Sequence, residues 1–183
     1  GHPAVSQDGK WLFFASDMPG GFGGADLYAS AIADDGTIGT PKNLGPEINT
    51  AANDMFPSFT NGKLYFASDG HFGWGGLDIY ESTFYGDLKF TEPRNLGAPI
   101  NSNKDDFGYI VDSSDDFGYF SSNRSGGKGG DDIYYFTKEK APCDQFISGR
   151  VTNSKSKAPI ADASIKVLNA FGDKITEATT KPD

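Results

Sequence analysis

Gly23-Gly24-Ala25-Asp26-Leu27-Tyr28 is the most informative segment of this sequence, because two near-copies of it follow. The first copy, Gly75-Gly76-Leu77-Asp78-Ile79-Tyr80, begins 52 residues later, and the second, Gly129-Gly130-Asp131-Asp132-Ile133-Tyr134, begins a further 54 residues on. Other segments repeat in the same register, such as Asn43-Leu44-Gly45 and Asn95-Leu96-Gly97. Several independent matches in one register indicate an internal repeat of about fifty residues.

Each repeat is predicted to form four short β-strands. Aromatic and β-branched residues fill short runs, and turn-forming residues separate these runs. Asp8-Gly9 and Asn61-Gly62 are dipeptides typical of hairpins, and each joins a first strand to a second one. The expected first strands are residues 3–6, 57–60 and 108–112, the second are 11–16, 64–68 and 118–122, and the third are 26–31, 78–83 and 132–137. Fourth strands are expected around residues 42–44 and 94–96, and the third repeat lacks one.

Four strands in about fifty residues match the size of one β-propeller blade. We therefore predict an all-β chain in which residues 1–139 form a partial β-propeller of three blade repeats, at about 1–52, 53–104 and 105–139. A blade buries its faces against two neighbours, and propellers usually have four to eight blades. The remaining blades are expected upstream of Gly1, and the alternative is a pairing of two chains with three blades each.

The composition changes near residue 138, where the repeat ends. Residues 140–145 are predicted to be a linker, and residues 146–183 the truncated start of a β-sandwich. Strands are expected there at residues 146–152, 164–168 and 174–179, because the sequence alternates between apolar and polar side chains. Three strands are too few to close a sandwich.

The charge and the apolar pattern exclude several classes of partner. The 183 residues carry a net charge of -9, which argues against nucleic acid or anionic lipid as the main partner. No run of about eighteen apolar residues occurs, so no transmembrane segment is expected. Cys143 is the only cysteine, which excludes an internal disulfide.

An aspartate follows the glycine loop of every repeat. Asp26, Asp78 and Asp132 are each expected to accept hydrogen bonds from backbone N–H groups of the preceding loop. The repeated structural positions are Gly24, Asp26, Tyr28, Gly76, Asp78, Tyr80, Gly130, Asp132 and Tyr134. The alternative interpretation is a calcium site built from Asp17, Asp26, Asp69 and Asp78, although calcium needs six or more oxygen ligands and the EF-hand spacing is absent. No other cofactor is expected.

Three aromatic residues lie within the glycine loops, where a strand core would not hold them. Phe22, Phe72 and Trp74 could pack over a neighbouring blade. Alternatively, they could be exposed on one rim and stack on a glycan or hold a protein.

The sequence offers no catalytic motif. The Gly-x-Ser-x-Gly elbow of serine hydrolases is absent. His2 and His71 are the only histidines, and neither belongs to a cluster with zinc-ligand spacing. Cys143 lies in the predicted linker without a partner histidine motif. We therefore expect no catalytic residues and no enzymatic activity.

The motifs resemble a known repeat family. His2-Pro3-Ala4-Val5-Ser6-Gln7-Asp8-Gly9-Lys10 resembles the PD40, or TolB-like, repeat of WD40-like propellers. The Gly-Gly-x-Asp-(Ile/Leu)-Tyr loop and the Asn-Leu-Gly…Ile-Asn segment are similar to the version in OmpA-family proteins of Bacteroidota. Gln7 stands where the repeat usually has proline, and the third repeat lacks the Asp-Gly turn. Ser148-Gly149-Arg150-Val151-Thr152 is similar to the start of a carboxypeptidase-regulatory-like domain.

This resemblance implies a periplasmic protein associated with the outer membrane, similar to lipoproteins of the type IX secretion system. Its propeller would be a non-enzymatic scaffold for other envelope or secretion proteins, and a separate C-terminal domain would bind peptidoglycan. The alternatives are a glycan- or peptide-binding propeller and the propeller of a prolyl-oligopeptidase-like peptidase. A regulatory-like sandwich after the blades, in place of an α/β-hydrolase domain, argues against the peptidase.

Overall fold

Every regular element in the described part of the chain is a β-strand. The computed structural model describes residues 1–139, 148–168 and 174–181. The chain divides into two compact units, Gly1–Lys140 and Ala141–Asp183. None of the described residues belongs to a helix long and apolar enough to cross a lipid bilayer. The chain is therefore all-β, as predicted.

Each repeat forms one antiparallel sheet, with strands in chain order across the sheet. The first sheet contains β1 (Ala4–Val5), β2 (Trp11–Ser16), β3 (Asp26–Ala31) and β4 (Lys42–Asn43). The second contains β5 (Asp54–Thr60), β6 (Lys63–Ser68), β7 (Asp78–Thr83) and β8 (Arg94–Asn95). The third contains β9 (Asp106–Val111), β10 (Phe117–Ser122) and β11 (Asp132–Thr137), and no fourth strand follows among its described residues.

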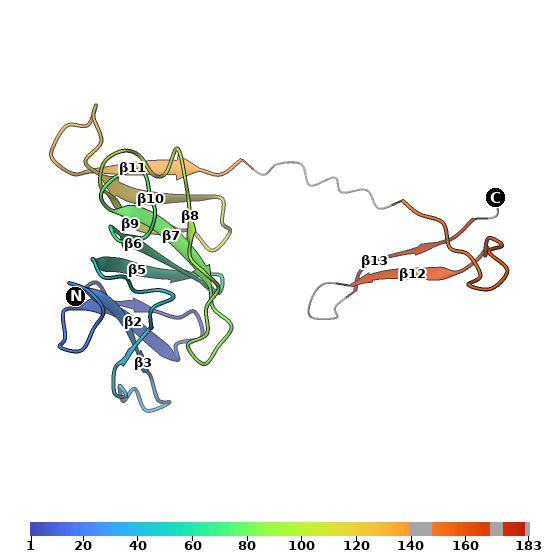
Figure 1. The fold of residues 1–183 in the computed structure, drawn as a ribbon, viewed down its shortest axis with the longest axis horizontal. Helices are drawn as coiled ribbons and strands as arrows, with labels where there is room; N and C mark the ends of the chain where they lie inside the picture. Colours follow the sequence, from blue (N-terminus) through green and yellow to red (C-terminus); the bar gives the residue numbers. More distant parts are fainter. Residues whose placement is uncertain (140–147, 169–173, 182–183) are drawn as a thin grey trace. The chain divides into compact units, whose positions relative to one another are not determined.

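The three sheets are stacked face to face in chain order, from the blue through the green to the orange part of Figure 1. The first strand of each later sheet makes the contact with the sheet before it, since β5 contacts β1, β2 and β3, and β9 contacts β5, β6 and β7. Antiparallel sheets that pack face to face in chain order are compatible with consecutive propeller blades. The predicted partial propeller agrees with this stack.

The cores lie between the sheets because side chains alternate between the two faces of a strand. Phe13 and Leu27 of the first sheet are buried against Leu64 and Phe66 of the second. A second, analogous core lies between the second and third sheets and contains Tyr65, Ile79, Tyr109, Val111 and Phe120. The second sheet is therefore buried on both faces.

The first strand of the second sheet begins three residues before its predicted start. Asp54 and Met55 pair with Ser68 and Ala67, and the register then shifts before Ser58. Pro57 lies in this bulge, where a missing N–H costs no ladder hydrogen bond. The sequence pattern placed the start at the proline because it could not show a strand that continues across a bulge.

The second unit contains one described hairpin, formed by β12 (Ser164–Leu168) and β13 (Lys174–Thr179). The strand predicted at residues 146–152 is wrong in its described part, because residues 148–151 form no strand and Thr152 makes only an isolated bridge to Pro159. An alternating pattern without a neighbouring strand does not sustain a strand. The predicted linker and Cys143 lie outside the described residues, and the β-sandwich stays a prediction.

Candidate functional site

The glycine loops gather at one end of the stack because each of them joins the second strand of a sheet to the third. We call this end the glycine-loop rim; it comprises residues 17–25, 69–77 and 123–131. The segments that lead from one sheet to the next, 44–53 and 96–105, end at the same side, since β5 and β9 start there. The rim is therefore built from every repeat.

A carboxylate fixes the backbone of each loop. Asp26 accepts hydrogen bonds from the N–H groups of Phe22 (2.5 Å) and Gly23 (3.1 Å). Asp78 accepts them from Trp74 and Gly75, and Asp132 from Lys128 and Gly129. Asp26 and Asp78 are buried, and burial raises the pKa of Asp78 against the effect of these hydrogen bonds. Since backbone N–H groups at the same two loop positions donate to the aspartate in all three repeats, the aspartate acts as a brace for the loop.

The loops of the first two sheets are pressed against the segment that enters the next sheet. A Cβ atom at Gly23 would lie 2.1 Å from the carbonyl oxygen of Ala52, and one at Gly75 would lie 2.0 Å from that of Lys104. Only glycine fits such a close backbone approach. At Gly129 in the third sheet, the nearest atom would be 3.7 Å away. The first two loops are therefore supported by a neighbouring sheet, and the third is not.

The segments that lead from one sheet to the next each contain a buried asparagine. Its side chain forms hydrogen bonds with the sheet that the segment leaves. Asn49 Oδ1 accepts the N–H of Leu27 at 2.7 Å, and its Nδ2 donates to Leu27 O at 2.9 Å and to Asn43 Oδ1 at 2.8 Å. Asn101 makes the same three bonds to Ile79 and Asn95. These contacts explain why the Asn-Leu-Gly…Ile-Asn segment repeats.

Three of the four carboxylates proposed as calcium ligands, those of Asp26, Asp69 and Asp78, accept hydrogen bonds from backbone or side-chain amides. Asp69 accepts hydrogen bonds from the backbone N–H and the Nδ2 of Asn53, at 2.6 and 3.0 Å. In the third repeat the pair is reversed, because Asn123 accepts from Asp105 N at 2.8 Å and donates to Asp105 Oδ2 at 2.7 Å. Across the described residues, no group of three or more His, Cys, Asp or Glu side chains is placed to hold a metal ion.

The three loop aromatics are held in solvent. Phe72 is 99% exposed, Trp74 is 65% exposed and Phe22 is 49% exposed. The alternative in which they pack over a neighbouring blade does not describe this structure. The backbone N–H groups of Phe22 and Trp74 are the ones that Asp26 and Asp78 hold. The rim therefore presents aromatic rings from a braced backbone.

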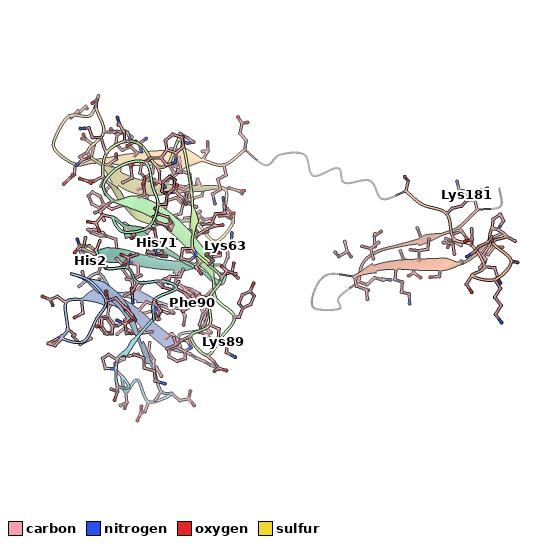
Figure 2. The ribbon with its side chains drawn as sticks, in the orientation of Figure 1. His2, Lys63, His71, Lys89, Phe90 and Lys181 are labelled. Atoms are coloured by element: carbon pink, nitrogen blue, oxygen red, sulfur yellow. The ribbon has the colours of Figure 1, made fainter. Side chains whose placement is uncertain are left out.

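Sequence reasoning missed the role of His71, which lies in the same loop as Phe72 but turns inward. Its Nε2 is 2.8 Å from Ile48 O, and its ring lies 5.1 Å from the ring of Tyr80. The only signal in the sequence was its place two residues after Ser68-Asp69, which repeats Ser16-Asp17. His71 and Phe90, both labelled in Figure 2, line a pocket formed by loops of the first and second repeats.

That pocket has a volume of about 480 Å³. Its lining residues come from the loops of the first and second repeats: Pro46, Glu47, His71, Phe90, Glu92 and Pro93. The lining contains no serine, threonine or cysteine that could serve as a nucleophile.

A buried carboxylate marks each junction between sheets. Asp106 is fully buried and forms an ion pair with Arg124 at 2.6 Å. Arg124 also donates to Ile100 O (2.5 Å) and Pro99 O (2.9 Å), and its guanidinium lies over the rings of Phe120 and Tyr134. Sequence reasoning missed this pair as well, because Asp106 begins β9 whereas Arg124 lies in the glycine loop after β10, and neither residue belongs to a motif.

The equivalent carboxylate at the first junction is Asp54. It is also fully buried, and it accepts hydrogen bonds from Thr50 N (2.6 Å) and Thr50 Oγ1 (2.9 Å). Among the described residues it forms no ion pair. Burial raises the pKa of Asp54, against hydrogen bonds from Ser68 and Thr50 that lower it.

The fold and the rim together define an all-β protein of stacked repeat sheets with an aromatic surface. No family model matches the sequence, and no curated protein matches it.

Proposed function

We propose that this chain is a non-enzymatic scaffold that binds a protein partner through the glycine-loop rim. The observation that carries the proposal is the exposure of Phe72 and Trp74 on a loop that Asp78 braces. Large aromatic side chains in solvent are typical of interaction surfaces, and tryptophan is enriched where binding energy is concentrated. A braced backbone also reduces the conformational entropy that is lost on binding.

The proposed setting is the periplasm of a Gram-negative bacterium, next to the outer membrane. It rests on the resemblance of the repeat to that of OmpA-family envelope proteins. In this proposal the rim holds a component of an outer-membrane complex, of the type IX secretion class, and a separate domain binds peptidoglycan. The net charge of -9 is compatible with a protein partner and unfavourable for nucleic acid.

A second candidate function is glycan binding at the same rim. The observation in its favour is that Trp74 and Phe72, close together in one loop, are both exposed. Flat aromatic rings are suitable for stacking on a sugar face.

One experiment separates these functions. The full chain and its Phe72→Ala/Trp74→Ala variant are used to capture proteins from an outer-membrane extract, and both are applied to a glycan array. Tyr85→Ala is the matched control, because Tyr85 is an exposed aromatic in the loop between β7 and β8, at the other end of the sheet.

We expect the wild type and Tyr85→Ala to capture the same envelope proteins, and the double variant to lose them. Glycan binding that the double variant loses would instead support the second candidate. Capture that is identical for all three proteins would contradict the role of the rim.

A further inference from the structure

The third sheet has an open apolar face. Five large side chains on it are between 38% and 77% exposed: Ile110, Phe117, Tyr119, Ile133 and Tyr135. They share one face because Tyr119 pairs directly with both Ile110 and Tyr135, and the other two lie two residues along the same strands. The rings of Tyr119 and Tyr135 lie 5.3 Å apart. We call this set the open face.

Two of these positions, those of Tyr119 and Ile133, are buried in both earlier sheets. Tyr119 and Ile133 correspond to Tyr65 and Ile79 of the second sheet, because both pairs hold the same places in the β-ladders. Tyr65 and Ile79 are buried under the third sheet, where Tyr109 lies 4.9 Å from Tyr65 between ring centroids.

The first sheet shows the same relation one step earlier. Its corresponding residues, Phe13 and Leu27, are buried under the second sheet, where Phe59 stacks on Phe13 at 5.3 Å. Each earlier sheet therefore hides this face beneath its successor, and the repeat itself shows what kind of surface covers it.

The matching surface is also present in this chain, on the outer face of the first sheet. Val5, Leu12 and Phe14 lie there, half-exposed, since Val5 pairs with Leu12 and Phe14 follows two residues later. Their counterparts in the second sheet pack on the first sheet: Phe59, Leu64 and Phe66. Their apolar counterparts in the third sheet, Val111 and Phe120, belong to the core against the second sheet.

We propose that the open face of the third sheet is a docking surface for the first sheet of a second copy of this chain. The contact continues the interface that already joins the sheets within the chain, and it uses the same repeat positions on both sides. Such an interface is heterologous, so two copies close into a ring if the rotation between sheets permits it, and extend into a longer assembly otherwise. Two copies supply six sheets, which is within the usual range of propellers.

The proposal is tested by the mass of the full 183-residue chain in solution, measured by light scattering from about 1 to about 100 µM. We expect a concentration-dependent species of at least twice the 19.6 kDa chain mass. Ile133→Glu and Val5→Glu each place a charge in one half of the interface, where it would be buried without a partner. Both positions are exposed in the single chain, so we expect both variants to fold and to remain single chains.

A mixture of these two variants gives the sharpest readout. The Val5→Glu chain keeps its open face, and the Ile133→Glu chain keeps its outer first-sheet face, so one intact interface is restored. We therefore expect the mixture to form a two-chain species that neither variant forms alone. Trp74→Ala, on the rim, should keep the wild-type mass, which separates this proposal from the proposed function.

Three results would overturn the proposal. One is a wild type that stays a single chain over the whole range, which would mean that another kind of sheet covers the open face. The second is association that both glutamate variants retain. The third is a mixture that stays monomeric although both variants show the wild-type circular dichroism spectrum.

Discussion

The junction between the first and second sheets and the junction between the second and third sheets share one backbone frame but stabilise their buried carboxylates differently. In both, a hydroxyl residue donates to the carboxylate through its backbone and its side chain, Thr50 to Asp54 and Ser102 to Asp106. At the second junction Arg124 adds an ion pair. At the first junction His71 binds the carbonyl of Ile48 instead.

This difference separates what the repeat requires from what is local. Both Arg124 and His71 hold the carbonyl oxygen of the equivalent isoleucine, Ile100 in one case and Ile48 in the other. The feature common to both junctions is therefore a side chain that donates a hydrogen bond to the segment between the sheets. Among the described residues, only the second junction has a cation, Arg124, that neutralises its buried carboxylate. The two junctions should therefore respond differently to substitution.

The largest effect is expected from Arg124→Gln. It removes the guanidinium and leaves Asp106 as a buried charge without its partner, which should lower the free energy of unfolding by about 3–5 kcal/mol. His71→Gln is the matched change at the first junction, and it should cost about 1 kcal/mol because one hydrogen bond is affected. Urea unfolding of the two variants measures both values.

Arg124→Gln combined with Asp106→Asn serves as the control for this prediction. Removing both charges should recover part of the lost stability, because the penalty comes from the unpaired carboxylate. Equal losses for Arg124→Gln and His71→Gln would contradict the contrast between the junctions.

A comparison of Gly75→Ala with Gly129→Ala tests whether the glycine loops differ in their packing. The loop of the second sheet packs against the segment that enters the next sheet, and the loop of the third sheet does not. The added methyl group at residue 75 would collide with Lys104 O, and the resulting shift of the backbone should cost about 1–3 kcal/mol. The same change at residue 129 meets no close atom and should alter stability by no more than about 0.5 kcal/mol. Thermal unfolding of both variants gives the comparison, and a large loss for Gly129→Ala would contradict it.

A smaller, pH-dependent effect is expected at the first junction. Burial raises the pKa of Asp54 above the unfolded value of 3.8, so the folded state binds this proton more tightly than the unfolded state does. The stability linked to this carboxyl is then fully present below pH 3.8 and is lost as the pH rises through the raised pKa. Asp54→Asn does not titrate.

The stability of the wild type relative to Asp54→Asn should therefore fall as the pH rises from 3.8 towards neutral. Urea unfolding of both proteins at several pH values measures this difference. A relative stability that rises with pH would contradict this prediction. It would show that the first junction favours the charged form of Asp54.

The repeat made the sheets and the braced loops predictable, whereas the contacts across the junctions were not. The alternating strands and the Gly-Gly-x-Asp loops are local, so a single sequence encodes them directly. The roles of Arg124, His71 and Asp54 depend on segments that meet only after the sheets have stacked. Residues 148–151 show the opposite error, because their alternating pattern pairs with no strand among the described residues.

The smallest effect is expected for calcium, which should leave the stability of both junctions unchanged. Asp69 accepts hydrogen bonds from the backbone and side-chain amides of Asn53. In the third repeat the residue at the position of Asp69 is Asn123, which has no charge. A cation that binds only the folded state would raise the melting midpoint, so melting with excess calcium and with chelator should give the same value.

Asp69→Asn, which copies the third repeat, should likewise cost less than about 1 kcal/mol, because this carboxylate is exposed and forms hydrogen bonds only at the surface. A midpoint that rises with calcium in the wild type and stays constant in Asp69→Asn would instead assign this carboxylate to a metal, and it would make the first junction the one that depends on an ion.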